Sequence, residues 1–206
     1  MREVELKAVV DNLAERRKLI EKAGALLSFE CKMSDRRYDL ATRQLSARDE
    51  VLRVRRYQSR GQTKTFLDWK GPTELRDVYK VREEVTTPVE DFDSLEEILL
   101  RLGFELIWEI DRDIAQYQLG GATVRFEMYA RMDVLVEVEG EPEAIENAID
   151  VLGLPRGTFT SWRLAEFVAQ FEHRTGVRAA ISDHEFVGDY RFRDALGTGQ
   201  GFRIAN

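Results

Sequence analysis

The segment Glu3-Val4-Glu5-Leu6-Lys7, near the start of the chain, alternates charged and apolar residues. Successive side chains of a β-strand point to opposite faces. As a strand, the segment therefore places its two glutamates and its lysine on one face and its valine and leucine on the other. Taken alone, such a strand is most simply the solvated side of an antiparallel sheet. Its meaning depends on whether other strands of the chain share the pattern.

The same alternation recurs along the chain and predicts eight strands. They cover about residues 2–10, 34–40, 50–58, 63–70, 78–86, 105–117, 122–130 and 133–140. Helical patterns of apolar residues lie between or after them, at about 12–24, 92–102, 142–152 and 161–173. Short links between consecutive strands, such as Arg60-Gly61, favour an antiparallel sheet over a parallel one.

At least six of the predicted strands carry a charged face opposite an apolar face. The four amphipathic helices match the apolar faces, so we expect them to cover the outside and leave the charged faces pointing inward. We therefore predict an α+β fold: an eight-stranded antiparallel closed β-barrel, or tunnel, with a charged lumen and helices packed outside. The sixth run fits poorly, because Arg112 falls in phase with Trp108 and Ile110. A β-bulge would restore the alternation there.

A charged lumen costs free energy unless a ligand or opposite charges neutralise it. Carboxylates are hard ligands that suit Mg²⁺ or Mn²⁺. The predicted metal ligands are Glu3, Glu5, Glu127, Glu137 and Glu139. Lysine and arginine suit phosphate oxygens. The predicted substrate-binding residues are Lys7, Arg53, Arg55, Lys70, Arg82 and Arg112. Both sets in one cavity indicate a polyanion bridged by a divalent metal; the alternative is an internal salt-bridge network without a ligand.

The overall composition restricts the partners of the protein. The chain has 31 basic and 38 acidic residues and a net charge of −7, which disfavours a nucleic-acid partner. No stretch approaches the roughly eighteen apolar residues of a membrane span, and the chain opens directly on a strand pattern. We therefore expect neither a membrane partner nor a signal peptide. The single cysteine, Cys31, allows no intramolecular disulfide, and we expect a cytoplasmic location.

In their order and spacing, these residues resemble the CYTH domain, also called the triphosphate tunnel metalloenzyme family. Its opening Glu-x-Glu-x-Lys is matched by Glu3, Glu5 and Lys7. The further matches, in chain order, are Tyr38-Asp39, Leu52-Arg53-x-Arg55, Lys70-Gly71-Pro72, Arg82-x-Glu84, and Glu127 followed by Glu137-x-Glu139. The resemblance covers roughly residues 1–175, and 176–206 form a C-terminal extension of unknown role. Ile110 departs from the family pattern, which often has lysine there, and Glu127 stands where aspartate is usual.

The resemblance implies an activity. The family includes class IV adenylate cyclases, thiamine triphosphatases and inorganic triphosphatases. Its basic residues would hold a triphosphate and its glutamates one or two Mg²⁺ or Mn²⁺ ions, with Glu3, Glu5 and Lys7 acting in catalysis. We expect hydrolysis of a triphosphate-bearing small molecule: inorganic triphosphate, thiamine triphosphate or a nucleoside triphosphate.

Two alternatives remain open. One is an adenylate cyclase that converts ATP to cyclic AMP and pyrophosphate, and the other is a non-catalytic polyphosphate-binding module. The sequence also leaves open the identity of the metal and the oligomeric state, a homodimer included.

Overall fold

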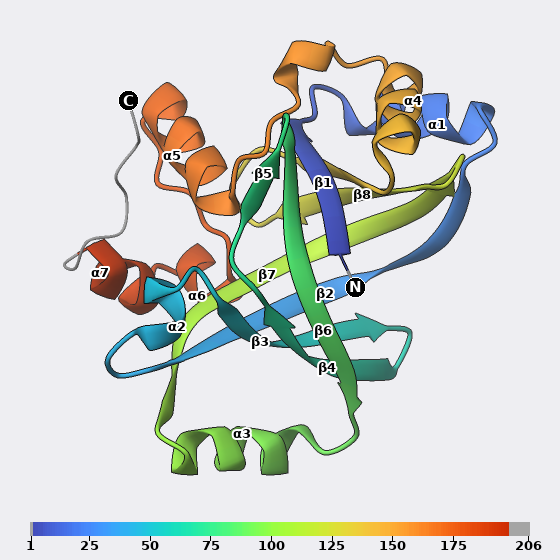
Figure 1. Cartoon of the computed structure of the whole chain (residues 1–206). Coiled ribbons are helices and arrows are strands. Elements are labelled where there is room, and N and C mark those ends of the chain that lie inside the picture. The colour runs from blue at the N-terminus through green and yellow to red at the C-terminus, as the bar shows by residue number, and fades with distance from the viewer. Residues whose placement is uncertain (1, 198–206) are drawn as a thin grey trace.

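A barrel of antiparallel strands forms the body of the protein (Figure 1). The computed structural model describes residues 2–197. Within them, one sheet has nine strands: β1 (Arg2–Val9), β2 (Leu26–Leu40), β3 (Val51–Ser59), β4 (Gln62–Lys70), β5 (Glu74–Arg76), β6 (Tyr79–Val89), β7 (Phe104–Leu119), β8 (Ala122–Tyr129) and β9 (Leu135–Glu139). Eight strands follow the order β1-β9-β8-β7-β2-β3-β4-β6, and the pairing of β6 with β1 closes the circle. The short β5 pairs with β6. The predicted closed eight-stranded barrel is confirmed.

The helices lie outside this barrel (Figure 1). They are α1 (Leu13–Lys22), α2 (Gln44–Ala47), α3 (Phe92–Arg101), α4 (Pro142–Leu152), α5 (Leu164–Thr175), α6 (Asp183–Phe186) and α7 (Arg191–Gly197), with a 3₁₀ turn at Arg156–Thr158. The four predicted helices correspond to α1, α3, α4 and α5. Asn12 and Asp91 begin α1 and α3 by accepting hydrogen bonds from backbone N–H groups of the first turn.

The apolar faces of the strands pack against these helices. The largest cluster joins α1 and α4 to the outer faces of β1, β7, β8 and β9, with Leu6, Val124 and Val138 fully buried against Ile145 and Ile149. A second cluster places α3 on the outer faces of β2, β3 and β4. The inner face is thereby left to the charged residues.

β7 contains a register shift between the pairs Arg37–Trp108 and Tyr38–Leu106, but this bulge does not remove the misfit of the sixth predicted strand. In the register of β2 with β7, Asp35 lies opposite Ile110 and Arg37 opposite Trp108, with no shift between Trp108 and Arg112. Arg112, Ile110 and Trp108 therefore share the inner face. Ile110 and Trp108 belong to an apolar cluster with α5 and Ile181. This cluster covers one end of the barrel, which we call the α5-covered end.

The segment after α5 docks on the barrel as far as the structure describes it. Ile181 O accepts a hydrogen bond from Asp111 N at 2.8 Å, and Ala180 exchanges backbone hydrogen bonds with Arg131. Ala180 and Ile181 are fully buried. None of the described helices is both long and apolar enough to cross a membrane.

Candidate functional site

Strand register places all the predicted site residues on the inner face of the barrel. Directly opposed residues of an antiparallel pair point to the same side. Between β1 and β9, Glu5 lies opposite Glu139 and Lys7 opposite Glu137. The other strands continue this face around the barrel, and their predicted site residues on it are Arg53, Arg55, Lys70, Arg82, Arg112 and Glu127.

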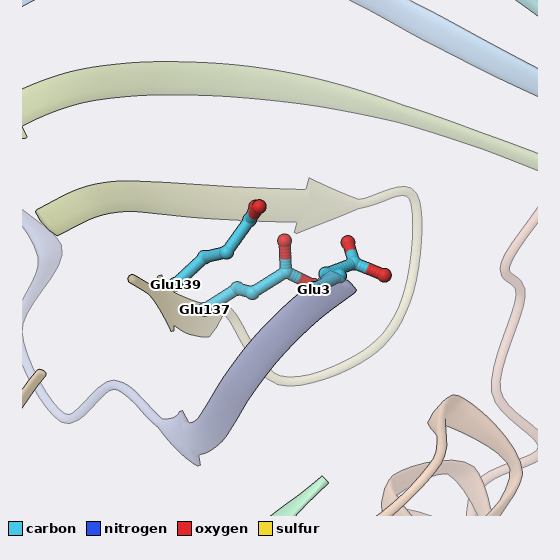
Figure 2. A group of neighbouring side chains, drawn as sticks. All are labelled: Glu3, Glu137 and Glu139. Carbon is cyan, nitrogen blue, oxygen red and sulfur yellow. The ribbon is translucent and has the colours of Figure 1, made fainter. Parts of the chain in front are cut away.

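Three of the five predicted metal ligands form one cluster. Glu3 reaches in from β1, and Glu137 and Glu139 reach in from β9 (Figure 2). One carboxylate oxygen from each lies within 4.8 Å of the other two. Burial, then Glu137 and Glu3, raise the pKa of Glu139 to about 7. Like charges are thus held together, as in a site that receives a cation.

The cluster fits a divalent cation by its chemistry. All its donors are carboxylate oxygens, which Mg²⁺ and Mn²⁺ prefer. Glu137 Oε1 is buried and forms an ion pair with Arg125 Nη1 at 2.8 Å, but it accepts no hydrogen bond. A buried carboxylate oxygen without a hydrogen bond is one that a metal ion could satisfy. We conclude that Glu3, Glu137 and Glu139 are suited to hold such an ion.

The other two predicted ligands have different partners. Glu5 forms an ion pair with Lys80. Glu127 accepts hydrogen bonds from Arg112 Nε at 3.1 Å and from the Tyr129 hydroxyl at 2.8 Å. Both carboxylates are buried, but neither belongs to the cluster of three. Metal binding by Glu5 and Glu127 stays a prediction.

Two lysines contact the carboxylates of the cluster. Lys7 Nζ lies 2.6 Å from Glu137, and Lys70 Nζ lies 2.5 Å from Glu3. Burial opposes the charge of Lys7, but Glu137, Glu127 and Glu5 outweigh it and raise the pKa of Lys7. Lys7 is therefore a fixed positive charge at the edge of the candidate metal site.

Asp35 organises the arginines of the lumen, and the sequence analysis missed it. It accepts two hydrogen bonds from Arg55, at 2.7 and 2.8 Å, and one from Arg112 at 3.0 Å. Arg53 Nη1 lies 3.6 Å from the same carboxylate and also bonds to Asp68. Burial acts against the charge of Asp35, but the three arginines hold its pKa well below the ordinary value. Asp35 thus fixes three predicted phosphate ligands in one place.

Arg82 has a different position from the other arginines. Its Nε donates to Gly71 O at 2.7 Å, and its Nη2 donates to Asp49 O at 2.6 Å. These bonds tie the loop after β4 to the segment after α2. Its predicted role in substrate binding remains a prediction.

Further charged and aromatic residues of the inner face were missing from the predicted site. They are Asp35, Arg37, Asp68, Lys80, Arg125 and Tyr129. For Asp35 and Arg37, the signal was available in their spacing of two within a predicted strand. The other four follow the same alternation as neighbouring residues that the prediction included. The residues that they pair with lie far away in sequence, so these pairings could not be predicted.

Known proteins resemble this chain in sequence and in fold. The CYTH domain model matches residues 1–150. PH1819 from Pyrococcus horikoshii OT3 is 25% identical, with a TM-score of 0.68 over 82% of this chain and 98% of that one. A candidate adenylate cyclase from Vibrio parahaemolyticus is 20% identical, with a TM-score of 0.70 over 81% and 97%.

A third structural neighbour has lower sequence identity. The candidate adenylyl cyclase HpAC1 from Hippeastrum, which shows a dominant triphosphatase activity, is 17% identical, with a TM-score of 0.59 over 84% of this chain and 96% of that one. No curated protein matches the sequence.

Proposed function

Because the chain belongs to the CYTH domain family, we propose that it is a divalent-metal-dependent triphosphatase whose substrate lies in the barrel lumen. The cluster of Glu3, Glu137 and Glu139 is the observation that carries this proposal. It lies beside two lysines and on the same inner face as the arginines around Asp35. A metal ion and basic side chains both neutralise the charge of a phosphate chain.

The acidic and basic residues of the site have different proposed roles. Glu3, Glu137 and Glu139 would hold Mg²⁺ or Mn²⁺. When bound, such an ion supplies charge neutralisation to phosphoryl oxygens and makes water a stronger nucleophile at neutral pH. Lys7 and Lys70 pair with carboxylates of this cluster, so they are placed to contact phosphate oxygens next to the ion.

The arginines complete the binding of the phosphate chain. A guanidinium group can bind two phosphate oxygens at once. Arg55 and Arg112 are held by Asp35, so their orientation is set before the substrate arrives. Such preorganisation lowers the barrier, because little rearrangement is needed when charge develops in the transition state.

Product analysis tests the proposal and separates it from the alternatives. The purified protein is incubated with inorganic triphosphate, thiamine triphosphate or ATP, with Mg²⁺ or Mn²⁺ and with EDTA as the control. We expect orthophosphate release that EDTA abolishes, and no cyclic AMP. Cyclic AMP with pyrophosphate from ATP would identify a cyclase instead. Tight binding of triphosphate without turnover would identify a binding module.

A further inference from the structure

Arg37 is a basic residue of the lumen that the proposed mechanism does not use. It lies on β2, opposite Arg53 of β3 on one side and Trp108 of β7 on the other. This register places it on the inner face, at the end of the barrel covered by α5. Its guanidinium lies over the Trp108 ring, 4.9 Å from the centroid.

Arg37 has no ion-pair partner in the part of the chain that the structure describes. Among residues 2–197, its side chain makes no ion pair and no hydrogen bond, and its Nε is buried. The neighbouring Trp108 Nε1 is also buried without a hydrogen-bond partner, and so is Arg112 Nη1. Three donors on the wall of β2 and β7 are therefore unsatisfied. Buried donors are normally paired, so each of these needs an explanation.

The charges around Arg37 make its position costly. Burial, and then the repulsion of Arg53, lower the pKa of Arg37 to about 10, with Arg82 and Arg112 acting in the same direction. Asp35 attracts it, but that carboxylate is already bonded to Arg55 and Arg112. At neutral pH Arg37 is thus a cation held among cations. Such a charge is stabilised when an anion occupies the space beside it.

Arg56 shows which of these features is significant. It lies on the outer face of β3, with its guanidinium 4.6 Å from the centroid of Phe92 and its Nε also buried and unpartnered. Stacking alone can therefore leave an arginine Nε without a partner. Arg37 differs because basic groups surround it and a second unsatisfied donor, Trp108 Nε1, lies beside it. These two features indicate an anion.

We propose that Arg37 and Trp108 Nε1 form a phosphoryl-binding subsite at the α5-covered end of the lumen. The proposal rests on the proposed function, since it supplies one more contact to the same triphosphate. Trp108 and Ile110 pack with α5 at this end. The group bound there is therefore an unsubstituted phosphoryl group, and any organic part of the substrate lies toward the other end of the barrel.

Equilibrium binding tests the subsite. Inorganic triphosphate is titrated by calorimetry into the wild-type protein, Arg37→Gln, Arg37→Lys and Trp108→Phe, in EDTA so that no hydrolysis occurs. We expect Arg37→Gln to bind about 10- to 100-fold more weakly, as for the loss of a charged hydrogen bond. Arg37→Lys should fall between the two, and Trp108→Phe, which keeps an aromatic ring, should show a smaller loss. Arg56→Gln is the matched control and should bind as the wild type does.

Thermal unfolding without ligand separates binding from a structural role. Removing a cation from among cations relieves repulsion, so metal-free Arg37→Gln should melt at the wild-type temperature or above it. A lower melting temperature together with weaker binding would overturn the proposal in favour of a structural role. Unchanged triphosphate affinity, with unchanged KM in Mg²⁺, would also overturn it and leave the triphosphatase proposal standing. A wild-type protein that binds no triphosphate, with or without Mg²⁺, would refute both.

Discussion

Glu139 connects the candidate metal site to pH. Burial together with Glu137 and Glu3 raises its pKa to about 7, and a carboxyl group must lose its proton before it can bind a metal ion. We predict that the affinity for Mg²⁺ or Mn²⁺ falls as the pH is lowered below about 7, approaching about tenfold per pH unit. Calorimetric titrations with Mn²⁺ on both sides of this pH measure it.

A matched pair of variants controls this measurement. Glu139→Gln should bind the ion weakly and lose the dependence on pH, whereas Glu143→Gln, on the exposed surface of α4, should behave as the wild type does. Constant affinity of the wild-type protein through this pH range would contradict the assignment of Glu139.

Glu139 also makes the stability of the protein depend on pH. The pKa of Glu139 in the folded protein lies above its ordinary value of 4.5. Its contribution to the stability of the metal-free protein is therefore fully present below about 4.5 and is lost as the pH rises through about 7. Stabilisation by added Mg²⁺ should accordingly be larger above pH 7 than in acid.

At the level of elements, Asp39 links β2 to α2. Its carboxylate accepts hydrogen bonds from the backbone N–H groups of Leu45 and Ser46, at 3.0 and 2.9 Å, and from the Ser46 hydroxyl at 2.6 Å. The Tyr38-Asp39 landmark of the sequence therefore has a structural role here. We predict that Asp39→Ala lowers the free energy of unfolding by about 2–3 kcal/mol, because these donors lose a charged acceptor.

Denaturant unfolding measures the stability of Asp39→Ala, and titration with Mn²⁺ measures its metal affinity. The metal affinity of Asp39→Ala should equal that of the wild type, since the carboxylate lies outside the cluster of Glu3, Glu137 and Glu139. Wild-type stability, or a large loss of metal affinity in a stable variant, would contradict this role.

The sequence predicted the long elements and failed on the short ones. All eight barrel strands and four helices were readable, because each is long enough to repeat its period. β2 begins at Leu26, earlier than predicted. Its first part was missed because a register shift near Leu27 interrupts the alternation of side chains there. β5, α2 and α6 have only three or four residues, too few to show a pattern.

The site was predictable in composition but not in pairing. Alternation alone placed the glutamates, lysines and arginines on one face. Which charges meet depends on register between strands that are distant in sequence: Arg112 reaches Asp35 across 77 positions. The α5-covered end could not be predicted either. An apolar inner face is explained only by the helix that covers it, and the sequence does not show where that helix lies.

At the scale of the whole molecule, the segment after α5 closes one end of the barrel. Ile181 is fully buried with Ile110 and α5, and its carbonyl pairs with β7. We predict that Ile181→Ala lowers the free energy of unfolding by about 2–4 kcal/mol through the cavity it leaves. Val187→Ala is the control: Val187 is 79% exposed, so its truncation should change little. Equal unfolding free energies for the two variants would show that the segment is not part of the cooperative fold.

Charges of the lumen neutralise one another through Asp35, Glu127 and the carboxylates beside Lys7 and Lys70. A triphosphate with a divalent ion would bring both signs of charge at once and exchange partners with these pairs. Binding should therefore occur inside the barrel, between the glutamate cluster and the arginines.

Crystals grown with Mn²⁺ and inorganic triphosphate locate the ion directly by its anomalous scattering. We expect a peak among the carboxylates of Glu3, Glu137 and Glu139, with phosphate density toward Lys7 and Arg55. Manganese or phosphate bound only outside the barrel would contradict the account.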